Sequence, residues 1–93
     1  MCYTYVLRSE RDARFYTGTT RDLRTRFKLH SEGKVRSTVH RRPLTLVYYE
    51  ACLDVEDAFR RERFLKTGKG KRFLRTRIAL FLSKAGFNKL ERH

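Results

Sequence analysis

An arginine and a histidine, Arg26 and His30, lie four positions apart in the stretch FYTGTTRDLRTRFKLH, residues 15–30. On a helix this spacing places both side chains on one face, one turn apart. An arginine fork stabilises negative charge that develops on a phosphate, and a neighbouring histidine can transfer a proton or contact the substrate. The alternative is that the pair only binds phosphate or lies on a solvated basic surface.

Three tyrosines precede or accompany this pair. Tyr3 and Tyr5 alternate in CYTYVL, so they point to the same face of a strand, and Tyr16 lies in a second short β-rich run that ends at Gly18. Tyrosines on strands are commonly amphipathic residues at the edge of a core. Beside a cation, a tyrosine can instead orient or deprotonate a water molecule, because positive charge lowers its pKa.

A carboxylate, Glu62, interrupts an apolar helical stripe. It falls between Ala58 and Leu65, where the spacing predicts a side chain that faces the sheet. A carboxylate in such a place needs a cation or a hydrogen-bonding partner. Either it pairs with an arginine such as Arg61 or Arg26, or it holds a divalent metal ion at the mouth of a cleft, as single carboxylates do for Mg²⁺.

The chain is strongly basic. It carries 23 Lys and Arg against 10 Asp and Glu, a net charge of +13 over 93 residues, which predicts a polyanionic partner. Residues 21–42 hold eight of these cations and residues 60–77 hold nine. We expect backbone contacts to nucleic acid from nine of them: Arg24, Lys28, Lys34, Arg36, Arg41, Arg42, Lys66, Lys69 and Lys71.

An anionic membrane is the competing polyanion. No apolar run approaches the ~18 residues of a spanning helix, and no cleavable leader pattern is present, so we expect a cytoplasmic protein without a membrane partner. Cys2 and Cys52 form no C-x-x-C pair, which argues against a disulfide framework or a zinc site.

The elements that must position these residues follow from hydrophobic periodicity and capping signals. Residues 2–7 and 15–17 predict an antiparallel hairpin, and residues 44–50 predict a third strand. Helices are expected from Thr20 or Asp22 to about residue 32, from Asp54 onward, and over 71–82, with Gly68 and Gly70 loosening the chain before the last one. The order ββαβαα indicates an α/β (α+β) sandwich. We expect one domain over residues 1–83 and a short tail over 84–93.

Taken in order, these pieces resemble the GIY-YIG nuclease superfamily. Tyr3-Thr4-Tyr5, a gap of ten residues and Tyr16-Thr17-Gly18 look like its two-part signature. Thr20, Asp22, Leu23, Arg26 and His30 resemble the helix with its arginine, and residues 58–66 resemble the helix with its metal-binding glutamate. The segment Lys66 to Gly70, KTGKG, resembles small single-domain members of the UPF0213-like group of predicted endonucleases.

The resemblance implies a central three-stranded antiparallel sheet flanked by helices, and hydrolysis of phosphodiester bonds with Mg²⁺ or Mn²⁺. By position, it implies catalytic roles for Tyr5, Tyr16, Arg26 and His30, with Glu62 as the metal ligand. The first triplet is YTY and the second is YTG, and Thr19 stands where some relatives have a lysine, which leaves the general base open.

The function expected on this basis is a metal-dependent endonuclease acting on DNA, including single-stranded or branched DNA. A non-catalytic nucleic-acid-binding module on the same scaffold is the alternative. The sequence identifies no protein partner.

Overall fold

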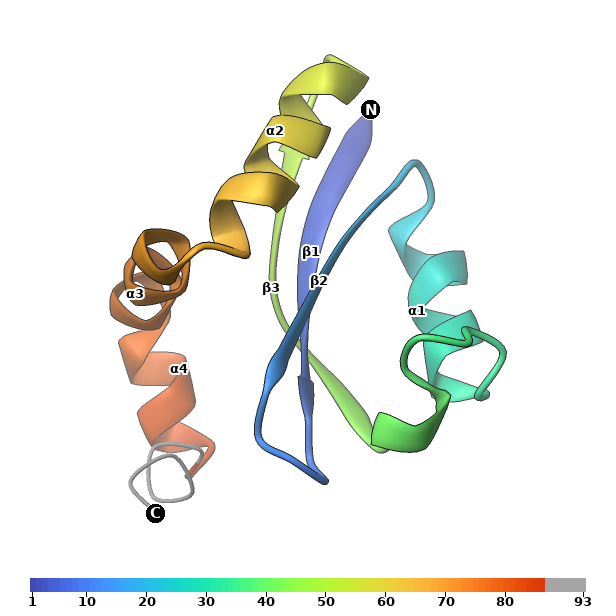
Figure 1. The fold of residues 1–93 in the computed structure, drawn as a ribbon, viewed down its shortest axis with the longest axis vertical. Helices are drawn as coiled ribbons and strands as arrows, with labels where there is room; N and C mark the ends of the chain where they lie inside the picture. The colour runs from blue at the N-terminus through green and yellow to red at the C-terminus, as the bar shows by residue number, and fades with distance from the viewer. Residues whose placement is uncertain (87–93) are drawn as a thin grey trace.

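The computed structural model describes residues 1–86, and Figure 1 shows a small sheet with helices on both sides. Three strands, β1 (Cys2–Ser9), β2 (Phe15–Thr20) and β3 (Leu44–Cys52), form an antiparallel sheet in the order β2-β1-β3. The first strand is therefore central, and β2 and β3 are the edges. The predicted α+β fold with a central three-stranded antiparallel sheet is confirmed.

One helix, α1 (Leu23–Ser31), packs on one face of the sheet. Asp22 is its N-cap, because its carboxylate accepts a hydrogen bond of 3.1 Å from the backbone N–H of Thr25. Gly33, with a φ of 78°, follows the helix in the left-handed conformation that glycine adopts without strain. Both boundaries agree with the prediction from sequence.

The other face carries α2 (Val55–Leu65) and α3 (Gly68–Arg77), and α4 (Ala79–Lys84) continues from α3. Asp54 caps α2 as predicted, accepting from the N–H of Glu56 at 2.8 Å. The core on this face joins Val6 and Val47 of the sheet to Leu65 and Leu74 of the helices. Phe59, the residue after the buried Ala58 on α2, is 47% exposed.

The glycine-rich segment after α2 differs from its prediction. Gly68 and Gly70 do not loosen the chain; they lie in the first turn of α3, and Thr67 caps this helix by accepting from the N–H of Gly70 at 3.0 Å. A Cβ at position 70 would lie 1.9 Å from the carbonyl oxygen of Phe64, so glycine allows α3 to pack directly against the end of α2. The helix predicted over 71–82 is divided at Ile78.

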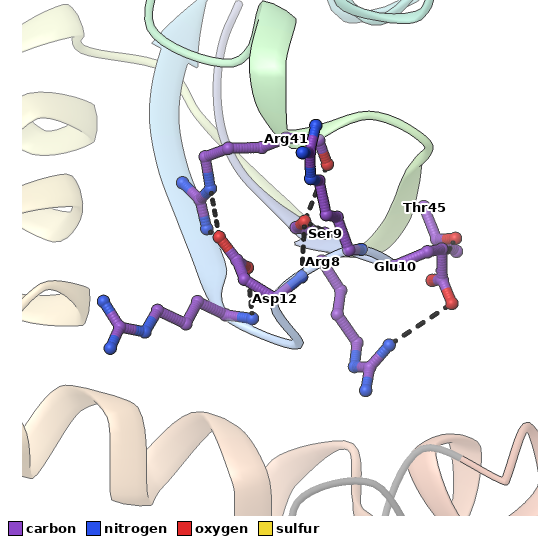
Figure 2. A network of polar contacts seen from close by, with 8 residues as sticks. Arg8, Ser9, Glu10, Asp12, Arg41 and Thr45 are labelled. Carbon is purple, nitrogen blue, oxygen red and sulfur yellow. Dashed lines mark hydrogen bonds and ion pairs between the residues drawn. The ribbon is translucent and has the colours of Figure 1, made fainter.

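A polar network fixes the turn between β1 and β2 (Figure 2). The hydroxyl of Ser9 donates to the carbonyl oxygen of Arg41 at 2.6 Å, and the Arg41 guanidinium pairs with Asp12 at 3.0 Å. Glu10 accepts from the hydroxyl of Thr45 at 2.9 Å and pairs with Arg8 at 3.4 Å. The turn is thereby tied to the short 3-10 helix η1 (Val39–Arg41) and to β3.

Residues 87–93, most of the predicted tail, lie outside the described residues, and the predicted domain boundary at 83 falls near the end of α4. Within residues 1–86, no helix combines the length and the apolar character needed to cross a bilayer.

Candidate active site

The centre of the site is Tyr5, a buried residue of β1 with an exposed fraction of 1%. Gly18 is its partner on β2, and the Tyr5 ring lies directly over the glycine. A Cβ at position 18 would lie 2.6 Å from the Tyr5 hydroxyl oxygen and 2.7 Å from Cζ. The glycine therefore leaves the space that the tyrosine ring fills, which distinguishes it from a simple turn residue.

His30 of α1 is fully buried beneath the Tyr5 hydroxyl. Its Nε2 is 2.8 Å from Tyr5 Oη, and its Nδ1 is 2.7 Å from the hydroxyl of the buried Thr38. Burial lowers the pKa of His30 to about 4, and the positive charge of Arg26 contributes to the decrease. The ring is thus neutral near pH 7, with one N–H that donates and one nitrogen that accepts. It holds Tyr5 at one end and is itself held by Thr38 at the other.

Arg26, one turn before His30, reaches the two signature tyrosines. Its hydrogen bond to Tyr5, together with one to Tyr16, raises the pKa of the guanidinium. Burial raises the pKa of Tyr5, and the Arg26 hydrogen bond opposes part of that rise. The ring of Tyr16 is 6.5 Å from that of Tyr5 and 5.3 Å from that of His30 between centroids. Four of the predicted residues therefore form one cluster on the α1 face of the sheet.

Glu62 approaches from the opposite face, on α2. Its Oε1 accepts a 2.7 Å hydrogen bond from the hydroxyl of Thr19, and its Oε2 is 2.8 Å from the Lys66 ammonium. The Glu62 side chain is 19% exposed. The expected alternative partners, Arg61 and Arg26, are engaged elsewhere; Arg61 pairs with Glu50 at 2.7 Å.

The edge strand β2 joins the two halves of the site. Tyr5 pairs with Gly18 and Thr4 pairs with Thr19, so adjacent positions point to opposite faces. Glu62 nevertheless lies close enough to Tyr5 for its negative charge to raise the tyrosine pKa, among weaker causes than burial. A phosphate at the edge of β2, beside Gly18 and Thr19, would have the arginine and tyrosines on one side and the carboxylate on the other.

The donor set restricts which metal would fit. Among residues 1–86 no three His, Cys, Asp or Glu side chains come together as a closed metal site. A single partly exposed carboxylate suits Mg²⁺ or Mn²⁺, which keep several waters and bind substrate phosphates. Glu62 fits that pattern if the Lys66 ammonium moves away from Oε2 of Glu62.

The nine predicted nucleic-acid contacts are spread over several surfaces. Arg24, Lys28, Arg36, Lys69 and Lys71 are exposed, whereas Lys66 is bound to Glu62 and Arg41 to Asp12. Lys34 pairs with Glu32 at 3.4 Å, and Arg42 donates to the carbonyl oxygen of Val39 at 3.1 Å. Lys71 and Arg41 line one basic hollow together with Arg14 and Arg75.

Two polar residues of the site were not predicted from the sequence as contributors. Thr38 lies in the connector 34–42, which has no periodicity, so nothing marks it as the partner of His30. Thr19 follows Gly18 directly, yet its bond to Glu62 spans 43 positions. The spacing of Glu62 and Lys66, four residues apart on a helix, is the one signal that predicts a contact to the carboxylate.

These features coincide with a known class of domain. The sequence model of the GIY-YIG catalytic domain matches residues 1–78, most of the chain, and the protein belongs to this family.

The individual proteins to which the chain is similar include several UPF0213 proteins. The chain is 38% identical to one from Streptococcus pneumoniae over 68 residues, covering 72% of this chain and 68% of that protein. It is also 38% identical to one from Staphylococcus haemolyticus, over 70% of this chain and 79% of the relative. The solution NMR structure of a UPF0213 protein from Bacillus halodurans, 35% identical, superposes with a TM-score of 0.52 over 82% of this chain and 84% of that one.

Proposed function

We propose that this protein is a divalent-metal-dependent endonuclease that hydrolyses phosphodiester bonds in DNA. The observation that carries the proposal is the cluster of Tyr5, Tyr16 and His30, beside Arg26, on one side of the β2 edge, while Glu62 is held by Thr19 on the other. The family match, which is to a catalytic domain, and the charge of +13 support the same reading.

The two tyrosines have different roles in this proposal. Tyr5 is 1% exposed and its hydroxyl is bonded to His30, so it does not meet bulk water. Tyr16 is half-buried, with its hydroxyl 3.4 Å from that of the exposed Ser37. Tyr16 therefore orients the attacking water and, as the phenolate, accepts its proton to become the phenol, whereas Tyr5 and His30 are positioning residues.

The water oxygen forms a bond to phosphorus as the bond from phosphorus to the leaving ester oxygen breaks. Arg26 stabilises the additional charge on the phosphoryl oxygens through its charge-assisted hydrogen bonds. The leaving oxygen takes its proton from solvent at this open edge of the sheet.

Glu62 would hold the metal ion. When bound, Mg²⁺ or Mn²⁺ supplies charge stabilisation at the phosphate and the leaving oxygen. Lys66 pairs with the same carboxylate, so the half-buried negative charge of Glu62 has a cationic partner within the protein. Exposed cations such as Arg24, Lys28, Arg36, Lys69 and Lys71 would hold the backbone of the strand.

A non-catalytic nucleic-acid-binding module is the second candidate. Both oxygens of Glu62 have partners within the protein, Thr19 and Lys66, so the carboxylate charge is paired by the chain itself. This candidate predicts binding with a steep dependence on salt and no turnover in any metal.

Cleavage of end-labelled single-stranded, duplex and branched DNA in Mg²⁺, Mn²⁺ or EDTA separates the two. The proposal requires cutting that depends on the metal and falls by at least a hundredfold in Arg26→Ala, on the scale of other lost transition-state contacts. Binding of all three substrates without cutting in either metal would select the binding module.

A further inference from the structure

A second hollow lies on the same face of the sheet as the catalytic cluster, between α1 and β3, with a volume of about 510 Å³. Aromatic rings of Tyr3, Tyr49 and Phe27 form much of its wall. Leu23 and Leu46 complete the apolar part. None of these residues belongs to the site proposed for phosphodiester hydrolysis.

Tyr49 is the unusual member of this groove. It is 55% exposed, although it lies on a strand directly opposite the buried Tyr5. Tyr3 packs against it edge to face, with centroids 6.2 Å apart and planes at 61°. The edge-to-face contact fixes the Tyr49 ring while leaving much of it accessible, which is the arrangement that a stacking platform requires.

Positive charge borders the rings. Arg21 and Arg24 line the groove at the start of α1, are exposed, and have no ion pair within residues 1–86. The one acidic lining residue, Asp22, accepts hydrogen bonds from the backbone and the hydroxyl of Thr25, so its oxygens are used in the helix cap. The groove thus combines accessible aromatic surface with an excess of guanidinium groups.

The groove is also close to the catalytic edge along the chain. Arg21 follows Thr19, the partner of Glu62, by two residues, and Tyr3 precedes Tyr5 by two on the same face of β1. A strand bound at the β2 edge would reach the groove by crossing the turn between β2 and α1.

We propose that this groove binds an unpaired nucleobase of the substrate strand, which stacks on Tyr49 while Arg21 and Arg24 contact the adjoining phosphates. A base in a duplex has both faces stacked already, so the groove selects single-stranded or unpaired segments. The inference rests on the proposed nuclease function for the identity of its ligand.

The test is binding of a labelled oligothymidine strand in EDTA, where no cleavage occurs, compared with an abasic strand of the same length. Tyr49→Ala should weaken binding of oligothymidine roughly tenfold, the usual effect of removing one stacking ring, and leave binding of the abasic strand unchanged. Tyr49→Phe keeps the ring and should bind like the wild type.

Phe59→Ala is the matched control, because Phe59 is 47% exposed and lies beside Arg60 and Arg63 on the opposite face of the sheet. It should leave binding of both strands unchanged. Equal affinities of Tyr49→Ala and wild type for oligothymidine would overturn the proposal. An equal loss on the abasic strand, or the same Tyr49-dependent loss on a blunt duplex, would also overturn it.

This measurement is independent of turnover. If Tyr49→Ala loses base-dependent binding but the wild type cuts no DNA in Mg²⁺ or Mn²⁺, the groove stands and the nuclease proposal fails. If the wild type cuts DNA and Tyr49→Ala binds oligothymidine as the wild type does, the nuclease proposal stands and the groove proposal fails.

Discussion

The ring of Tyr5 lies over Gly18 so closely that the glycine has no room for a side chain: a Cβ there would be 2.6 Å from the tyrosine hydroxyl oxygen. That hydroxyl is also 2.8 Å from Nε2 of His30 and bonds to Arg26. The glycine on the edge strand therefore sets the position of the tyrosine, and the tyrosine in turn contacts the two polar residues of α1.

Gly18→Ala should displace the Tyr5 ring and disturb the hydroxyl's contacts with both residues. A misplacement of about 1 Å in a catalytic cluster can reduce turnover roughly a hundredfold, and we expect a loss of DNA cleavage of that order. Gly68→Ala is the control, because a Cβ at position 68 meets nothing within 4 Å. Wild-type cleavage rates in Gly18→Ala would show that the packing of Tyr5 on Gly18 is irrelevant to activity.

The buried His30 should make stability depend on pH. An unfolded chain takes up a proton at this histidine near pH 6.5, whereas the folded protein does so only near pH 4. Between these values the unfolded state binds more protons, so stability falls as the pH is lowered, by about 3 kcal/mol from this group.

Urea unfolding at pH 7, 5.5 and 4 measures this dependence. His30→Gln should have a shallower decline than the wild type, whatever its stability at pH 7. His40→Gln, at an exposed histidine, should decline as the wild type does. Identical pH dependence in His30→Gln and the wild type would contradict a depressed pKa at His30.

Lys66 competes for the carboxylate that the metal would use. Lys66→Met frees Oε2 of Glu62 from a 2.8 Å ion pair that is partly exposed. Because such pairs contribute at most about 1 kcal/mol, the Mn²⁺ concentration for half-maximal cleavage should fall by a few-fold.

Lys69→Met removes an exposed lysine from the same region and should leave the metal requirement unchanged. Should Lys66→Met raise the Mn²⁺ requirement, Lys66 would assist the reaction and not merely occupy the ligand.

Gly70 is a structural requirement. Gly70→Ala places a Cβ 1.9 Å from the Phe64 carbonyl oxygen, which belongs to the backbone and cannot rotate away. We expect a destabilisation of about 3 kcal/mol or more, at the upper end for overpacking, seen as a lower melting temperature. Gly68→Ala should melt at or slightly above the wild-type temperature, since alanine favours helix. Equal melting of Gly70→Ala and wild type would contradict the close packing of α2 and α3.

Local signals in the sequence were enough to predict most of the fold. Alternation marked Tyr3 and Tyr5 as one face of β1, Asp22 marked the start of α1, and the i, i+4 spacing put Arg26 beside His30. Each of these is a contact or a conformation between near neighbours, which periodicity and capping describe directly.

The features that were missed depend on tertiary packing. The two glycines in KTGKG have low helix propensity, yet Thr67 caps a helix that begins at Gly68, and Gly70 lets this helix pack against the backbone of Phe64. The hydroxyls of Thr19 and Thr38 find Glu62 and His30 only after the sheet and helices assemble.

The central claim is that Glu62 is needed for metal-dependent hydrolysis and not for holding DNA. The most direct measurement compares Glu62→Gln with Glu56→Gln, an exposed glutamate on the same helix, in single-turnover cleavage with Mn²⁺ and in DNA binding with EDTA. The account predicts that Glu62→Gln binds DNA with near wild-type affinity and loses cleavage, while Glu56→Gln retains both. Cleavage by Glu62→Gln at the wild-type rate would contradict it.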